Sequence, residues 1–170
     1  ERSLFEYELA AKLSPNNYLS WLAVGSARER NGDASGAGSA LRYAEILAPN
    51  YTQVQWTLGN FLLRQNKTDE AFVEIKKATI SDPEYSAPAA ATAMQIFSND
   101  LELARNALGR TPRSDAEFAV IAANQKRYDD AYLLTSLNFA QELFEQDGKL
   151  TSLLLSVKPG YDPEKVKAAV

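Results

Sequence analysis

The chain has 170 residues, of which 45% are hydrophobic and 24% are charged, so it is long enough for one sizeable core. It contains neither cysteine nor histidine, which excludes thiolate nucleophiles, imidazole bases, disulfides and nearly all transition-metal sites. Its net charge of −4 at pH 7 argues against broad binding to nucleic acid, and no apolar run approaches the length of a membrane span.

Proline recurs at a fixed interval in the first half of the chain. Pro15, Pro49 and Pro83 stand 34 residues apart (49 − 15 and 83 − 49), each after an apolar helical pattern. Further columns keep this interval: Ala10, Ala44 and Ala78; Gly25 and Gly59; Gly32 and Asn66. Self-similarity at one period of this length indicates an array of helical repeats.

The first element, residues 2–15, ends like the second helix of a pair, so we expect its first helix to have been cut away or to have diverged. Two regular pairs follow at 17–49 and 51–83, and each has a turn between its helices. In each second helix, small residues at steps of three and four mark one apolar face: Ala37, Ala44, Ala71 and Ala78. The closing proline cannot continue the helix and turns the chain towards the next pair.

The later elements are less regular. An incomplete pair at 85–109, broken at Asn99-Asp100, lacks the closing alanine and proline. Residues 110–114 read as a loop before a divergent pair at 114–145, whose first helix is expected over 116–124. Residues 147–170 are expected to form helices that cap the last apolar face. The pattern therefore predicts one all-α domain over residues 1–170.

These columns resemble the tetratricopeptide repeat family over roughly residues 4–108. Val24-Gly25 and Leu58-Gly59 occupy the Leu-Gly step of the family signature, whereas Trp56 departs from its column by one residue. The resemblance implies a right-handed superhelix of antiparallel helix pairs, an α-solenoid with a divergent C-terminal cap. The run 56–72 is similar to repeats in bacterial proteins, some attached to the cell envelope, which leaves cytoplasm, periplasm and envelope open as locations.

The resemblance also implies a concave groove lined by the first helix of each pair. By register, its outward positions are Leu22, Ser26, Arg30, Gln53, Trp56, Asn60, Leu63, Arg64, Met94 and Phe97. Family members that capture a peptide's C-terminal carboxylate carry Lys, Asn and Arg here. A carboxylate clamp is not expected, because Leu22, Ser26, Ala87 and Ala91 replace those residues.

The groove is expected to be a mostly apolar strip with Asn60 at its centre, flanked by Arg30 and Arg64, and suited to an amphipathic helix or an extended apolar peptide. An alternative of equal weight is that Trp56, Met94 and Phe97 only pack against neighbouring first helices.

Acidic residues fall at the expected starts of second helices, where they cap the helix or favour its dipole. They are Asp33, Asp69, Glu70, Asp100, Asp129 and Asp130. Capping accounts for them better than acid-base catalysis, which needs two carboxylates at a fixed separation across a cleft. Residues 35–38 (Ser-Gly-Ala-Gly) lack the Gly-Lys-Ser/Thr of a phosphate loop, and two glycines in one helix predict a locally weak segment that permits close packing or a soft joint.

The sequence therefore predicts a scaffold without catalytic activity, cofactor or metal, whose partner is a protein or peptide held by the first helices. The alternative is a structural or assembly module that associates with itself, or with the rest of a larger bacterial protein, and binds no peptide.

Overall fold

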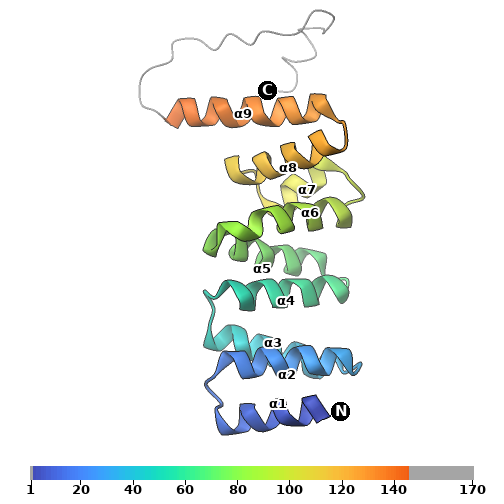
Figure 1. Ribbon diagram of the computed structural model, residues 1–170, viewed down its shortest axis with the longest axis vertical. Helices are drawn as coiled ribbons and strands as arrows, with labels where there is room; N and C mark the ends of the chain where they lie inside the picture. Colours follow the sequence, from blue (N-terminus) through green and yellow to red (C-terminus); the bar gives the residue numbers. More distant parts are fainter. Residues whose placement is uncertain (1, 146–170) are drawn as a thin grey trace, which may run out of the picture.

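The structure is a computed structural model that describes residues 2–145 of the chain, with side chains from 4 to 136. This part of the chain consists of helices and turns without a strand, and the helices stack in chain order along one long axis (Figure 1). The capping helices expected over 147–170 lie outside the described residues. The elements are α1 (Arg2–Leu13), α2 (Tyr18–Arg30), α3 (Ala34–Leu47), α4 (Thr52–Arg64), α5 (Thr68–Ser81), η1 (Pro83–Tyr85), α6 (Ser86–Ile96), α7 (Leu101–Leu108), α8 (Pro112–Asn124) and α9 (Tyr128–Glu145).

Acidic side chains begin several of the second helices, as the sequence indicates. Asp33 accepts a hydrogen bond from the Gly36 amide at the start of α3, and Asp100 accepts one from the Leu103 amide at the start of α7. The acidic residues of α5 and α9 instead lie inside the first turn, at 69–70 and 129–130, where they favour the helix dipole. Helix initiation thus accounts for both sets.

The turns inside the helix pairs use left-handed backbone conformations. Gly32 has a φ of 83° between α2 and α3, and Asn66, in the same column of the repeat, has a φ of 59° between α4 and α5. Asparagine tolerates this region better than most side chains, because its short polar group can hydrogen-bond locally. Asn66 therefore supplies in the second pair the left-handed turn residue that Gly32 supplies in the first.

Small residues set the distance between the helices of each regular pair. A Cβ atom on Gly25 would lie 2.6 Å from Leu41 Cγ, and one on Gly59 would lie 2.7 Å from Ile75 Cγ1. Both distances are too short for real carbon atoms, so only glycine permits this approach. The alanines that face these glycines and the neighbouring helices are fully buried: Ala37, Ala44, Ala71 and Ala78.

One hydrogen bond recurs at the turn before each regular first helix. Trp21 donates from Nε1 to the carbonyl oxygen of Pro15 at 2.7 Å. Gln55, which is 34 residues later (55 − 21), donates from Nε2 to the carbonyl oxygen of Pro49, also at 2.7 Å. Gln55 therefore replaces Trp21 in the second repeat. This explains why Trp56 stands one residue out of column: it serves a different contact.

Helix α8 begins earlier than the sequence pattern predicts. Pro112 is its first residue, so 112–114 form a helical turn and not the expected loop. Proline suits this position because the first helical amides have no partner within the helix. Thr111 and Ser114 complete the start as a capping box, in which each side chain bonds the other residue's backbone amide.

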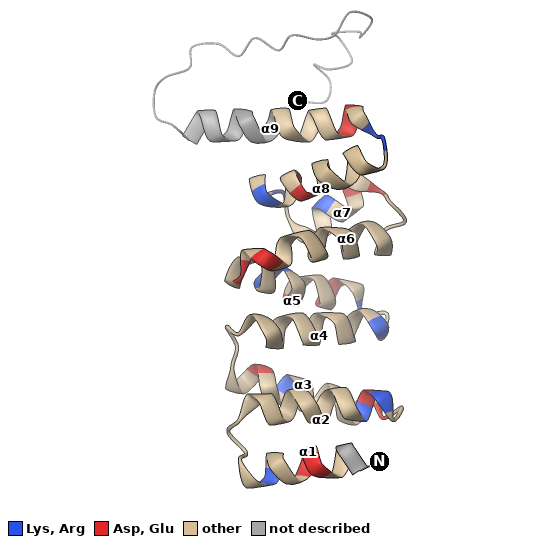
Figure 2. Cartoon of the chain, in the orientation of Figure 1, with Lys and Arg blue, Asp and Glu red and all other residues tan. Residues whose placement is uncertain are grey.

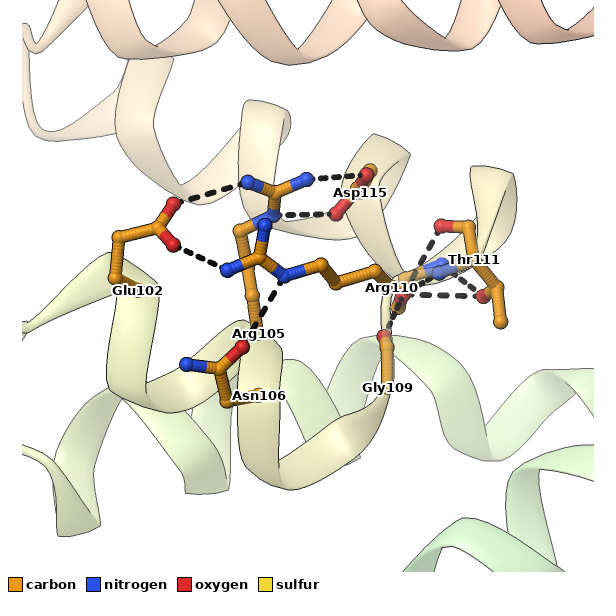
Figure 3. Close-up of polar contacts among 8 residues, drawn as sticks. Glu102, Arg105, Asn106, Gly109, Arg110, Thr111 and Asp115 are labelled. Atoms are coloured by element: carbon orange, nitrogen blue, oxygen red, sulfur yellow. Dashed lines mark hydrogen bonds and ion pairs between the residues drawn. The ribbon is translucent and has the colours of Figure 1, made fainter. Parts of the chain in front are cut away.

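A buried ion pair joins α7 to α8, where the closing alanine and proline of the repeat are missing (Figure 3). Arg105 on α7 bonds both carboxylate oxygens of Asp115 on α8, through Nε and Nη2 at 2.8 Å each. The exposed fractions of the two side chains are 8% and 1%. The hydrogen bond with Asp115 is the main reason that the pKa of Arg105 is raised. Glu102 holds the outer edge of the guanidinium at 3.0 Å.

Candidate functional site

The residues of the predicted groove lie on the first helices α2, α4 and α6 or directly after α6, but two of them are in the core. Leu22 and Met94 are only 5% and 2% exposed. Leu22 packs with residues of α3 and α4, and Met94 packs with residues of α5, α7 and α8. Both side chains point between helices, so neither offers surface to a ligand.

The aromatic residues expected in the groove also make contacts within the fold. Trp56 packs edge-on against Tyr85, with the ring centroids 5.1 Å apart. Phe97 lies against Phe72 on α5, with centroids 5.5 Å apart. Leu63 is half-buried and contacts two of the core clusters. These contacts favour the alternative in which the bulky residues of the strip pack neighbouring helices.

Asn60 lies at the centre of the predicted groove and is half-buried. Its Nδ2 donates to the backbone carbonyl oxygen of Trp56, one turn earlier, at 2.8 Å. No hydrogen bond to its Oδ1 is found in the described part of the chain, which leaves one acceptor for a ligand amide. Ser26 occupies the same column on α2 and is half-buried too.

Arginines end the predicted groove on α2 and α4, and Figure 2 shows the basic residues at these two helix ends on the same side of the stack. Arg64 is bound to Glu29 of α2 through Nε and Nη2, at 2.7 and 2.8 Å, and this hydrogen bonding is the main reason that its pKa is raised. Arg30 is exposed and forms no ion pair with another described residue. Gln53 is exposed at the opposite end of α4.

The accessible side chains here are therefore mostly small or polar, although Leu19 on α2 is 48% exposed, whereas the sequence led us to expect an apolar strip. Six of them follow columns at the repeat interval: Ala23 and Thr57, Ser26 and Asn60, Arg30 and Arg64. The apolar members of the pattern are used between helices, because the stacked pairs leave little other surface to bury. The face defined by the six residues in these columns is called the first-helix face below.

Exposed apolar side chains lie mainly on the second helices, α1, α3, α5, α7 and α9, whose outward faces the sequence analysis did not single out. Ile46 and Ile80 are equivalent positions (80 − 46 = 34) and are 73% and 76% exposed. The α3 helix also borders an open cleft of about 560 Å³ against α4. The sequence could have indicated these exposed residues, because the repeat register shows which positions of a second helix face outwards.

Within the described residues, no cluster of candidate metal ligands and no membrane-spanning helix is found. Among the side chains that the structure describes, residues 4–136, no three acidic ones come together as metal ligands. Across residues 2–145 no helix combines the length and the apolar character needed to cross a bilayer.

No protein-family model matches the sequence, and no curated protein is significantly similar to it. Among solved structures, the chain is similar to a crystal structure of MamA, with 14% identity over 84% of this chain and 88% of that chain and a TM-score of 0.53. It is also similar to a MamA RS-1 double mutant, with 13% identity over 85% and 86% of the two chains and a TM-score of 0.51. At this identity the likeness concerns the fold alone. The described part of the chain has the all-α fold of a tetratricopeptide-like solenoid.

Proposed function

We propose that the chain is a non-catalytic scaffold that holds a protein or peptide partner along the first-helix face. The observation that carries this proposal is the free acceptor of Asn60 at the centre of the face, with an unpaired cation, Arg30, at its end. A peptide in extended conformation can donate a backbone amide to Asn60 Oδ1 and place a carboxylate near Arg30. Neither contact requires the core to rearrange.

The side chains on this face also favour a peptide over a small molecule. Apart from Arg30 and Arg64 they are short, and they recur at the repeat interval, so they form a strip along successive first helices. Small-molecule sites are usually concave and apolar. An extended segment can contact successive first helices in turn, with its backbone towards the polar column of Ser26 and Asn60.

A peptide selection tests this proposal. The chain is panned against a random peptide-display library, and the enriched peptides are synthesised and titrated into labelled protein while backbone amide shifts are recorded. We expect the shifts to centre on 57–60 of α4, and the affinity to fall about tenfold in Asn60→Ala, because one hydrogen bond is lost. A Val73→Ala variant, changed on the exposed side of α5, is the matched control. Peptides that bind Asn60→Ala as tightly as the wild type would contradict the proposal.

A second candidate function is self-association through α1, and the repeat register favours it. Ala44 and Ala78 are 0% exposed, whereas Ala10 in the same column is exposed. On the same helix, Phe5 and Leu13 are 69% and 76% exposed. We propose that a second copy of the chain covers this face of α1, since an apolar helix face of this kind is stabilised by burial.

Sedimentation of the chain over a range of concentrations tests this second function. Association is expected in the wild type and is expected to be lost in Leu13→Glu, which places a charge on the apolar face. Ile80→Glu, at an equally exposed position on α5, is the control that keeps the wild-type behaviour. A monomer at every concentration would rule out self-association.

A further inference from the structure

The cleft beside α3 has an apolar floor and a basic rim. Phe61 and Leu62 of α4 form the floor, and the wall on the α3 side is made of small residues around Gly38. Arg42 and Lys67 are the charged residues that line it, so no carboxylate does. The cleft lies on α3 and the end of α4, and shares no residue with the first-helix face.

The repeat register explains why this space is open. The position of Gly38 is occupied by Phe72 on α5 and by Leu4 on α1 (72 − 38 = 34 and 38 − 4 = 34). Phe72 is 4% exposed and fills the next junction, where its ring packs against Phe97 at the end of α6. Gly38 has no side chain to do the same at the end of α4, so the space that an aromatic ring fills one repeat later is left as a cleft.

The geometry at Gly38 shows that the space is not closed by the backbone. A Cβ atom built there would lie 3.4 Å from Phe61 Cε1 and 3.5 Å from Phe61 Cζ, which is ordinary van der Waals contact. Gly25 and Gly59, in contrast, are needed for helix contact. Glycine at 38 is therefore not required by the packing of the helices.

The charged side chains at the rim determine which groups can flank an aromatic ring in the cleft. Arg42 reaches from α3 to Glu70 on α5 at 2.8 Å, and Lys67 shares the same carboxylate at 3.5 Å. Arg42 also pairs with Glu45 at 3.3 Å, whereas Glu70 is the only ion-pair partner of Lys67 among the described residues, and the Lys67 side chain is 56% exposed. An acidic group beside the aromatic ring would meet positive potential at this rim.

We propose that the cleft is a second binding site, which accepts a phenylalanine side chain flanked by carboxylates from an extended segment of a partner protein. The ring takes the place that Phe72 takes at the next junction, against Phe61. The flanking carboxylates pair with Lys67 and Arg42. This site works independently of a ligand on the first-helix face.

The probe for this site is the peptide acetyl-Glu-Asp-Phe-Asp-Glu-amide, titrated into labelled protein while the Gly38 amide and the Leu62 methyl signals are followed. We expect saturable shifts at both residues in the wild type. In Gly38→Leu the new side chain fills the cleft, and the affinity is expected to fall at least about tenfold. Replacing phenylalanine by alanine in the peptide is expected to have a similar effect.

Controls separate loss of the site from loss of the fold. Gly38→Leu is expected to raise the thermal midpoint, because leucine favours a helix more than glycine does. Lys67→Glu, an exposed change, is expected to weaken binding several-fold in low salt, while Asn60→Ala binds the peptide as the wild type does. The absence of saturable shifts at Gly38 in the wild type, or equal affinity in Gly38→Leu, would overturn the proposal without bearing on the first-helix face.

Discussion

The ion pair between Arg105 and Asp115 gives the sharpest test of how the irregular half of the solenoid is held. Replacing Arg105 by methionine leaves the Asp115 carboxylate, 1% exposed, without its partner. Breaking a buried pair in this way costs about 3 to 5 kcal/mol. Asp115→Leu is expected to cost about 3 kcal/mol, the lower end of this range. Glu102, at 3.0 Å from Arg105, still neutralises part of the arginine's charge.

The double variant Arg105→Met/Asp115→Leu separates the attraction between the two charges from the cost of burying them. Both buried charges are then gone, so its stability is expected within about 1 kcal/mol of the wild type. Because the two single costs add up to about 6 kcal/mol or more, this corresponds to a coupling of about 5 kcal/mol or more. Arg110→Met is the control: this arginine also bonds Glu102 but is 52% exposed, so a change below about 0.5 kcal/mol is expected.

Urea unfolding followed by circular dichroism measures these free energies, and hydrogen exchange locates them. Each helix pair of a solenoid contacts mainly its neighbours. The loss of stability is therefore expected to appear as early opening of α7 and α8, while the backbone amides of α2 to α5 stay protected from exchange. The reasoning would be refuted if each single variant cost less than about 1 kcal/mol, or if the costs simply added in the double variant.

Three further outcomes are expected. Gly38→Ala is expected to stabilise the fold by about 1 kcal/mol, because alanine favours a helix more than glycine does. Gly25→Ala is expected to destabilise it by about 1 to 3 kcal/mol, because the added methyl group overpacks the helix contact. Thermal melts that place the two variants in the opposite order would contradict this. Gln55→Ala is expected to cost about 1 to 3 kcal/mol in urea unfolding, since it leaves the turn carbonyl before α4 unpaired. The pKa of Lys77 is raised above its ordinary 10.5, mainly by a hydrogen bond to Glu74. The stability that this hydrogen bond contributes is therefore fully present below pH 10.5, and it is lost as the pH rises through the higher pKa of the folded state. The alkaline loss of stability is therefore expected to be shallower in Lys77→Met, and equal slopes would refute that assignment.

Much of the fold was predictable because its signals are local or periodic. The interval of 34 residues identified the helix pairs, and Gly25 marked a close helix contact, because only glycine allows two helices to approach so near. Asp33 and Asp100 marked helix starts through the amides that they cap. These features depend on a few neighbouring residues or on exact repetition, and both can be read without coordinates.

The candidate sites were less predictable, because the exposure of a side chain depends on which neighbouring helices pack against it. Leu22 and Met94 follow the outward register of a first helix, yet the neighbouring helices cover them. Gln55 could not be matched to Trp21 by residue type, since the turn carbonyl needs only a donor at the right place.

The sequence by itself determined that the chain is an array of helix pairs, because period and small residues leave few other ways to bury its apolar faces. Only the tertiary structure decided which surfaces remain. The partner of Arg105 is set by how α7 meets α8, and no spacing rule indicates it. The opening at Gly38 likewise exists because one junction lacks the ring that its neighbour has, and an empty space becomes visible only when the elements around it are in place.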